Sequence, residues 1–157
     1  MAKKILLWIL TLSCAMAIFY FSSQEAAESG KASSSVIKTV IKVLDLKDNL
    51  SEEEVEKLSI DLTFVVRKTA HFCIYGLLGF LITLLYLEYG FFGKRLFLNS
   101  SVTAFLYAIS DEFHQSFVKG RSGEIRDVCI DSIGAMCGAL IVIICFLVIK
   151  RRKERSK

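Results

Sequence analysis

Four apolar runs constrain the fold of this chain more than any other feature of its sequence. They cover residues 5–21, 72–89, 95–112 and 128–149, and the third is the least apolar. A bilayer core takes ~20 helical residues, with a usual range of roughly 17–25. Lipid also requires every backbone polar group to be bonded within the chain, and runs this long and uniform do not suit barrel strands. The sequence therefore predicts an all-α fold, an integral membrane four-helix bundle forming a single domain over residues 1–157.

The hydropathy and the charge distribution of the chain argue against several other classes of protein. The sequence is 54% hydrophobic with a mean hydropathy of +0.50, which excludes a disordered chain and a solvated coiled coil. Its 20 basic and 16 acidic residues leave a net charge of +4, with no long basic stripe outside the termini. This distribution argues against nucleic-acid binding.

Basic residues flank the runs in a way that predicts their orientation. Lys3 and Lys4 precede the first run, Lys94 and Arg95 lie at the start of the third, and residues 150–153 follow the last. With four spans, all of these lie on one side, which the positive-inside rule makes cytoplasmic. We therefore expect a multi-pass protein with cytoplasmic N- and C-termini. The first run is interpreted as an uncut anchor, although a signal peptide cleaved after residues 15–17 is the alternative.

The outer loop, residues 22–68, contains one or two amphipathic helices in this interpretation. The first covers Val36–Leu44 and either lies in the headgroup plane or packs on the bundle. The second begins at Ser51, where Glu54 completes a capping box. No proline or glycine interrupts the chain from there to Gly76, so this helix is expected to continue into the second span.

Cysteine and metal-ligand patterns are uninformative about chemistry. The five cysteines lie in or beside the apolar runs without a CxxC pair, so we expect small buried hydrophobic side chains rather than disulfides or zinc ligands. No HExxH or comparable spacing occurs, and no metal or cofactor is predicted.

Three polar clusters meet at the predicted outer boundary of the spans. Ionisable groups at membrane depth cost ~2.5–3.5 kcal/mol each and usually face a partner or a cavity. Their spacing favours a common pocket, although ion pairs that only hold helices together would produce the same pattern. The clusters are Arg67, His71 and Tyr75; Asp111, Glu112, His114 and Gln115; and Arg121, Arg126, Asp127 and Asp131, which Gly134 and Gly138 follow.

These residue types suit acid–base chemistry beside a bound anion. Imidazoles and carboxylates exchange protons near neutral pH, and guanidinium groups hold anions bidentately. The candidate catalytic residues are His71, Asp111, Glu112, His114, Asp127 and Asp131. The candidate substrate-binding residues are Arg67, Tyr75, Gln115, Arg121 and Arg126.

At these residues the sequence resembles the VanZ-like family of membrane proteins. The resemblance rests on Phe21-Ser22-Ser23-Gln24, on Arg67-Lys68-x-Ala70-His71-x-x-x-Tyr75, on Asp111-Glu112-x-His114-Gln115, and on Gly120-Arg121 followed by Asp127-x-x-x-Asp131-x-x-Gly134. It covers nearly the whole chain. Lys119 is a departure, at a position where many relatives have proline. The resemblance implies a bacterial cell-membrane protein from a family named for a link to teicoplanin resistance, and it implies no particular reaction.

The leading hypothesis is an outward-facing pocket that binds or acts on a cell-envelope lipid or a lipid-linked precursor. The alternative is a non-enzymatic membrane module that binds a partner or shields envelope precursors. Transport is a third, weaker hypothesis, because four spans show no inverted repeat and would need an oligomer.

Overall fold

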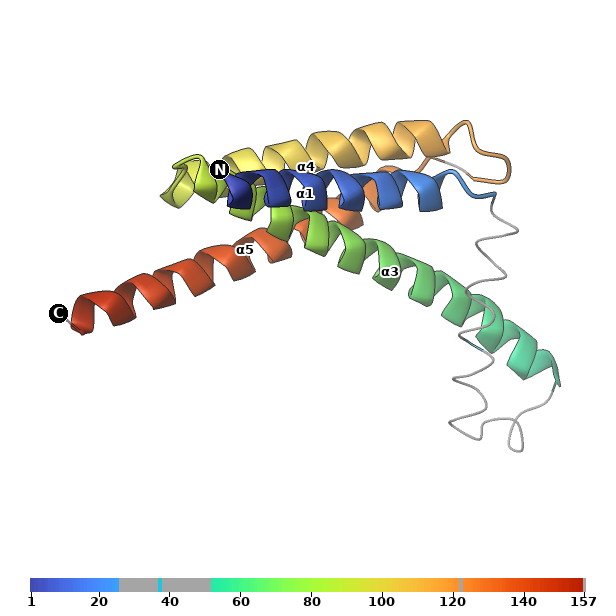
Figure 1. Cartoon of the computed structure of the whole chain (residues 1–157). Helices are drawn as coiled ribbons and strands as arrows, with labels where there is room; N and C mark the ends of the chain where they lie inside the picture. The colour runs from blue at the N-terminus through green and yellow to red at the C-terminus, as the bar shows by residue number, and fades with distance from the viewer. Residues whose placement is uncertain (26–36, 38–51, 122, 157) are drawn as a thin grey trace.

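The computed structural model describes residues 1–25, 37, 52–121 and 123–156. This part of the chain forms four long helices (Figure 1): α1 (Ala2–Ser22), α3 (Glu52–Glu88), α4 (Gly93–Gln115) and α5 (Ile125–Arg155). The predicted all-α fold is therefore confirmed. The predicted amphipathic segment 36–44 lies outside the described residues, apart from Ile37.

The outer helix and the second apolar run form one continuous helix, as the absence of proline and glycine predicted. The 37 residues of α3 extend ~55 Å at the usual helical rise. The helix begins at Glu52, within the predicted outer loop, and continues without a break to Glu88, just before the turn that leads to α4 (Figure 1).

Three helical segments in the described chain are long and apolar enough to cross a membrane. They are Ala2–Ser22, Leu62–Glu88 and Ile125–Arg155. The 23 residues of α4 provide ~35 Å of length, but polar residues such as Asn99 and Ser100 lower its hydropathy. The crossing of α4 therefore remains a prediction. Both termini lie at one end of the bundle (Figure 1).

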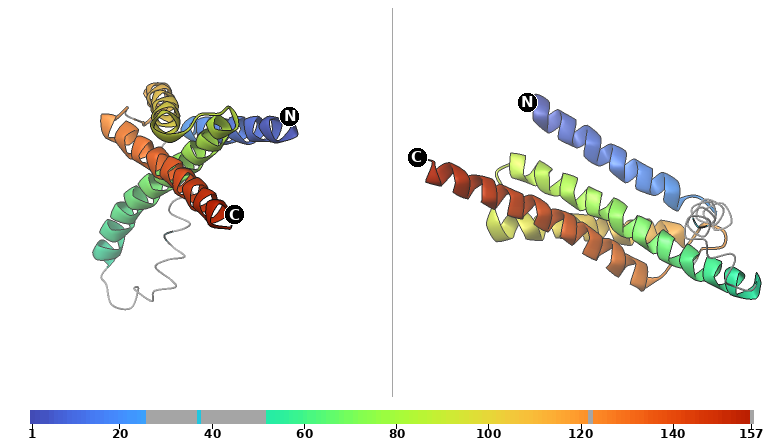
Figure 2. Two further views of the ribbon diagram at one scale, coloured as in Figure 1. Left: turned by 90° about the vertical axis from the view of Figure 1, so that its left-hand side faces the viewer. Right: turned by 90° about the horizontal axis from the view of Figure 1, so that it is seen from below.

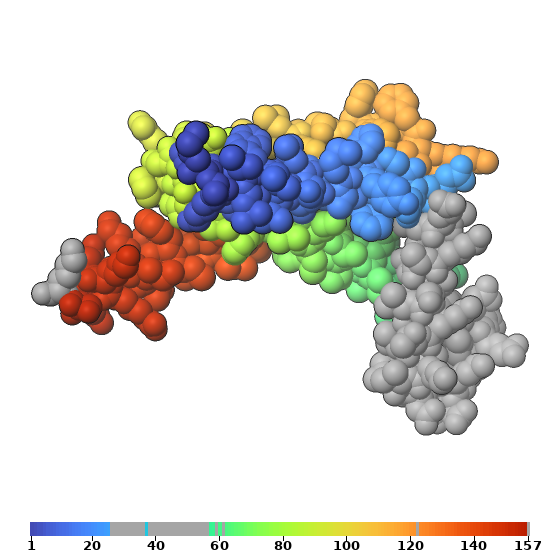
Figure 3. All heavy atoms as spheres, in the orientation of Figure 1, coloured from blue at the N-terminus to red at the C-terminus, as the bar shows by residue number. Residues whose placement is uncertain are grey.

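The bundle buries a modest core and exposes large apolar side chains around its circumference. Tyr75, Leu78 and Ile82 of α3 meet Ala104 and Ala108 of α4 in this core. Side chains such as those of Leu12, Phe105 and Ile144 face outward. Figure 3 shows α1 along one face, and the end of α5 projecting from the other helices. An apolar circumference is the surface that lipid tails solvate.

The closest helix contact lies where α3 and α5 cross, which is visible from two directions (Figures 1 and 2). A Cβ atom added at Gly79 would overlap the backbone of Ala135, and one at Gly138 would overlap the carbonyl of Gly76. Small residues spaced four apart allow this approach of two backbones. The glycines of α5 thus form a close-packing face.

The turn between α3 and α4 is closed by glycine. Gly90 and Gly93 adopt positive φ angles of 84° and 58°, a region that other residues rarely enter. At the other end of the bundle, Gly120 has a φ of 78° in the loop between α4 and α5. This loop therefore turns at a glycine, with Lys119 rather than proline before it.

The expectation that all five cysteines are buried was wrong. Each is a free thiol, and Cys14 is buried against α3, but the other four are exposed on the outside of the bundle. In a membrane protein such positions face lipid, which favours a small apolar side chain as well as a protein interior does.

The close crossing predicts a large effect of adding one methyl group. Gly138→Ala should destabilise the fold by about 1–3 kcal/mol, the usual cost of overpacking, because the new Cβ has only backbone to displace. Unfolding in mixed micelles, followed by circular dichroism, would measure this cost. Cys137→Val, which adds bulk at the neighbouring exposed position, is the control. Equal stability of Gly138→Ala and the wild type would contradict the crossing.

Candidate functional site

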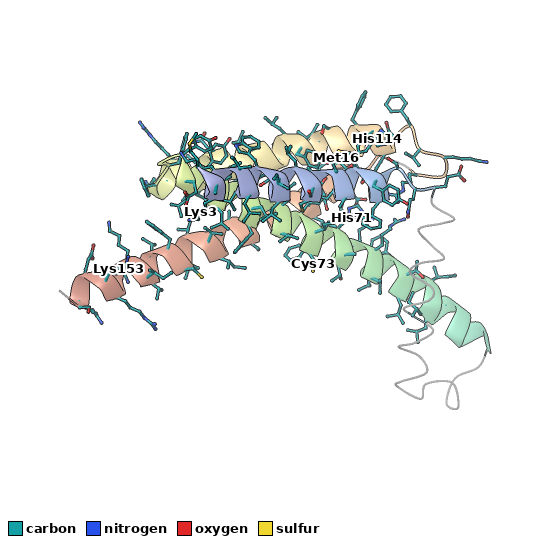
Figure 4. The ribbon with its side chains drawn as sticks, viewed as in Figure 1. Lys3, Met16, His71, Cys73, His114 and Lys153 are labelled. Carbon is teal, nitrogen blue, oxygen red and sulfur yellow. The ribbon has the colours of Figure 1, made fainter. Side chains whose placement is uncertain are left out.

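Polar side chains from all four helices gather away from the end that carries the termini. Figure 4 shows Lys3 and Lys153 toward the end that carries the termini, and His71 and His114 farther from that end. The contributing segments are the last turn of α1, the middle of α3, the last turns of α4 and the first turns of α5. All four helices therefore contribute polar side chains to this part of the bundle.

Asp111 is the centre of a buried hydrogen-bond network. Its Oδ2 atom accepts bonds from Ser22 Oγ at 2.8 Å, Tyr75 OH at 3.0 Å and Gln115 Nε2 at 3.0 Å. Gln115 also donates to Ser22 Oγ at 3.3 Å. Asp111 is 3% exposed, so the bonds replace the water that a buried carboxylate would otherwise need. The network joins α1, α3 and α4.

Arg121 ties the loop after α4 to the end of α1. Its Nη1 donates to Gln115 Oε1 at 2.9 Å, its Nε to the Gln24 carbonyl at 3.0 Å, and its Nη2 to the Phe21 carbonyl at 3.2 Å. A cation is favourable at a helix C-terminus, where carbonyl groups lack partners. Burial lowers the pKa of this guanidinium, and the nearby charge of Arg67 acts in the same direction. Arg121 remains charged at neutral pH nonetheless.

Glu112 links the end of α4 to the start of α5. Its Oε1 atom accepts a bond of 2.6 Å from the backbone N–H of Glu124, the residue before α5. The carboxylate thus satisfies one of the N–H groups at a helix N-terminus, where negative charge is favoured.

An ion pair between Lys68 and Asp127 holds α3 against the first turn of α5. Both side chains are largely buried, at 11% and 17% exposed. Lys68 also lies over the Phe64 ring, 5.3 Å from its centroid. Asp127 is therefore occupied by a partner that sequence reasoning did not list as a site residue.

His71 and Asp131 face one another across the α3–α5 crossing. Their Nδ1 and Oδ1 atoms are 3.6 Å apart, an ion-pair distance rather than a hydrogen bond. Asp131 is 1% exposed, while the His71 side chain is 22% exposed. The carboxylate therefore lies behind the imidazole, and Nε2 is the ring nitrogen left for a ligand.

A polar pocket of about 60 Å³ opens beside His71. Its lining is Arg67, Lys68, His71, Gln115, Gly120, Arg121, Glu124 and Asp127. Lys68 is paired with Asp127, and the Arg121 nitrogens bond to the chain. No hydrogen bond or ion pair joins Arg67 to any described residue. The guanidinium group of Arg67 is therefore available to an anion that enters the pocket.

An apolar crevice of about 250 Å³ adjoins this pocket. Ile18, Phe21 and Ser22 of α1 and Ala70, His71 and Ile74 of α3 line it. His71 lines both spaces, so the polar pocket and the apolar crevice meet at its side chain.

Two of the predicted residues lie beside the site rather than in it. His114 stacks on Phe19 with ring centroids 4.4 Å apart, and its Nε2 is 3.1 Å from Ser23 Oγ. Arg126 pairs with Glu124 at 3.1 Å and lies over the Phe64 ring. Neither lines the polar pocket, and neither belongs to the Asp111 network. Four other predicted residues also do not line the pocket: Tyr75, Asp111, Glu112 and Asp131.

Sequence reasoning missed Ser22 and Lys68 as site residues. Both belong to motifs that carry the family resemblance, Phe21-Ser22-Ser23-Gln24 and Arg67-Lys68, so the signal was present in the sequence. Ser22 looked like the polar end of an apolar run, and Lys68 like an ordinary flank.

Three buried carboxylates each retain one oxygen without a hydrogen-bond donor in the described structure. These atoms are Asp111 Oδ1, Glu112 Oε2 and Asp131 Oδ1. Among the described residues, no group of three His, Cys, Asp or Glu side chains is placed to hold a metal ion. Each of the three carboxylate oxygens could accept a further hydrogen bond.

Comparison with known families places the chain in a wider group. A family model described as VanZ/LLP1 matches residues 7–147, which is most of the chain. Neither the curated proteins nor the solved structures contain a significant match.

Two tyrosines provide a matched test of the Asp111 network. Tyr75 donates to a carboxylate, whereas Tyr107 donates to the neutral carbonyl of Ala15. Hydrogen bonds to charged groups contribute about 1.5–3 kcal/mol, and neutral ones about 0.5–1.5 kcal/mol. Tyr75→Phe should therefore lower the free energy of unfolding more than Tyr107→Phe, measured in mixed micelles. A larger loss from Tyr107→Phe would show that Asp111 is not the centre of the network.

Proposed function

The chain belongs to the VanZ/LLP1 family, and from that membership we propose that its polar pocket binds the anionic headgroup of a cell-envelope lipid or lipid-linked precursor. The pocket faces outward from a bacterial cell membrane, α4 also crosses the membrane and so brings the number of spans to four, and both termini are cytoplasmic. Recognition of such a headgroup is the proposed basis of the family's link to teicoplanin resistance. The basic residues near the termini support this orientation.

The observation that carries the proposal is that the charged group of Arg67 has no partner among the described residues. Arg67 lines a cavity, and it is close enough to the second guanidinium of the pocket, Arg121, for its charge to lower the pKa of Arg121. Two neighbouring guanidinium groups repel each other until an anion lies between them. A phosphate or carboxylate accepts the parallel N–H donors of arginine bidentately.

The adjoining crevice favours a lipid over a free anion. The crevice between α1 and α3 is predominantly apolar, and it meets the polar pocket at His71. An amphiphile satisfies both spaces at once, with its charged group at Arg67 and its tail along Ile18 and Ile74. Burial of that tail adds affinity at roughly 25 cal/mol per Å² of apolar surface.

His71 is the group best placed to move a proton to or from the bound headgroup. Asp131 lies behind its Nδ1 atom, so Nε2 is left to face the ligand. A carboxylate in this position orients an imidazole. His114 is less suited, because its ring stacks on Phe19 outside the pocket.

A specific observation also favours the alternative, a non-enzymatic module. Several predicted site residues are bonded within the chain: Asp111 to three donors, Arg121 to three acceptors, and Asp127 to Lys68. These contacts hold helices together whether or not a ligand binds. In that case function resides in the outer loop, and the pocket residues affect only folding.

Glycerol phosphate tests the pocket directly, because it carries a lipid-like phosphate without a tail. We expect weak binding to the purified protein in neutral detergent by calorimetry. Arg67→Gln should weaken it about tenfold or more, the loss of a charge-assisted hydrogen bond. Lys119→Gln removes an equal charge from an exposed loop position outside the pocket lining, and should bind like the wild type. Wild-type affinity in Arg67→Gln, or equal losses in both variants, would refute the pocket.

A cellular assay separates the two functions. In a bacterial host lacking family members, expression of the wild type should lower susceptibility to teicoplanin. Arg67→Gln and His71→Asn should abolish the effect at unchanged membrane levels, while Lys119→Gln should keep it. If both pocket variants act like the wild type and changes in 36–44 abolish the effect, the module is correct.

A further inference from the structure

A second, larger cavity lies near the opposite end of the bundle. It has a volume of about 540 Å³ and lies between α1, α3 and α4. Thr11, Leu78 and Ile82 contribute to its walls, together with Tyr107. This volume falls in the range of roughly 300–1,000 Å³ typical of small-molecule sites. Its lining is predominantly aliphatic and aromatic, with two threonines, Thr11 and Thr103, so a mainly apolar occupant fits it.

Aromatic residues and a cation surround the end of this cavity. Trp8 and Tyr89 both line it, and Trp8 Nε1 donates to Tyr89 OH at 3.1 Å. Lys4 Nζ lies 4.5 Å from the centroid of the Tyr89 ring. Tryptophan and tyrosine concentrate at the level of lipid headgroups. The deep part of the cavity is therefore at the depth of acyl chains, and Lys4 is at the depth of headgroups.

The charge at this end of the bundle is strongly positive. Glu88 is paired with Lys3, and further basic residues are Lys94 and Arg95 at the start of α4 and residues 150–153 near the end of α5. The ammonium group of Lys4 has no carboxylate partner among the described residues, so it retains its charge for a ligand. An anionic headgroup is the chemistry that complements it.

We propose that this cavity is a binding site for an anionic phospholipid, with an acyl chain between α1 and α3 and the phosphate at Lys4. The site is separate from the polar pocket, since the two share no lining residue. It therefore does not rest on the function proposed for that pocket. A bound lipid at this position fills the space between α1 and its neighbours, and stabilises the contact of α1 with the bundle.

Trp8 is the only tryptophan in the chain, and its position at the cavity makes it a direct reporter. The protein is placed in phosphatidylcholine vesicles with a minor fraction of phosphatidylglycerol or phosphatidylcholine brominated on its acyl chains. Bromine quenches tryptophan on contact. Brominated phosphatidylglycerol should quench Trp8 more strongly, in a saturable manner that unlabelled phosphatidylglycerol reverses. Equal quenching by the two brominated lipids would overturn the proposal.

Two charge variants separate a discrete site from a general surface field. Lys4→Gln should weaken the phosphatidylglycerol preference about fivefold, the usual effect of one basic residue near a membrane surface. Lys94→Gln removes the same charge at the same end of the bundle but beside a different cavity, and should keep the preference. Equal losses in both variants would identify a surface field and overturn the site.

A third variant tests whether the acyl chain enters the cavity. Ala15 lines it, and Ala15→Leu narrows it without altering charge. Brominated phosphatidylglycerol should quench Trp8 less in Ala15→Leu than in the wild type, whereas quenching in Lys94→Gln should equal that in the wild type. Circular dichroism establishes whether it is folded, and if it is not, the two lysine variants decide the question. Undiminished quenching in folded Ala15→Leu would overturn the proposal.

Discussion

The backbone contact between α3 and α5 is the constraint on which the rest of the structure depends. Gly76 and Gly79 meet Gly134, Ala135 and Gly138, and no side chain separates the two helices there. This approach brings His71, beside the crossing, to Asp131, one turn before Gly134. It also aligns the first turn of α5 with Lys68, so that the ion pair to Asp127 can form. Steric fit of glycines thus determines which charges meet.

The polar residues at this end of the bundle divide into two groups by what they contact. Asp111 and Arg121 use their hydrogen-bonding capacity on the chain and connect segments distant in sequence. Arg67 and His71 keep a donor or a ring nitrogen toward a cavity. The first group provides rigidity in a region where helix ends and loops meet, and this rigidity holds the second group in position. Under the proposed function, helix association and ligand binding are complementary uses of one polar cluster.

The sequence predicts the elements better than their contacts. Apolar length and the absence of helix breakers were sufficient for the four helices and for the continuity of α3. The spacing of Arg67, His71 and Tyr75 correctly indicates one helical stripe, but it cannot show that Tyr75 contacts α4 while His71 contacts α5. Such pairings depend on where helices cross. For the same reason, His114 and Arg126 were expected at the centre and lie beside it, because helical spacing does not specify the helix face turned to the bundle.

The contacts of α1 also have a consequence for how the protein is made. Its two ends are secured by residues far along the chain: Lys3 by Glu88, Ser22 by Asp111, and the Phe21 carbonyl by Arg121. During synthesis this helix enters the bilayer before any of these partners exists. Because residues 5–21 carry no charge, this helix can remain in the bilayer without these partners. Asp111 and Asp131, which lipid would not tolerate unaccompanied, are translated only after their partners Tyr75 and His71. The order of residues along the chain therefore matches an order of insertion in which Asp111 and Asp131 each arrive where a partner is already present.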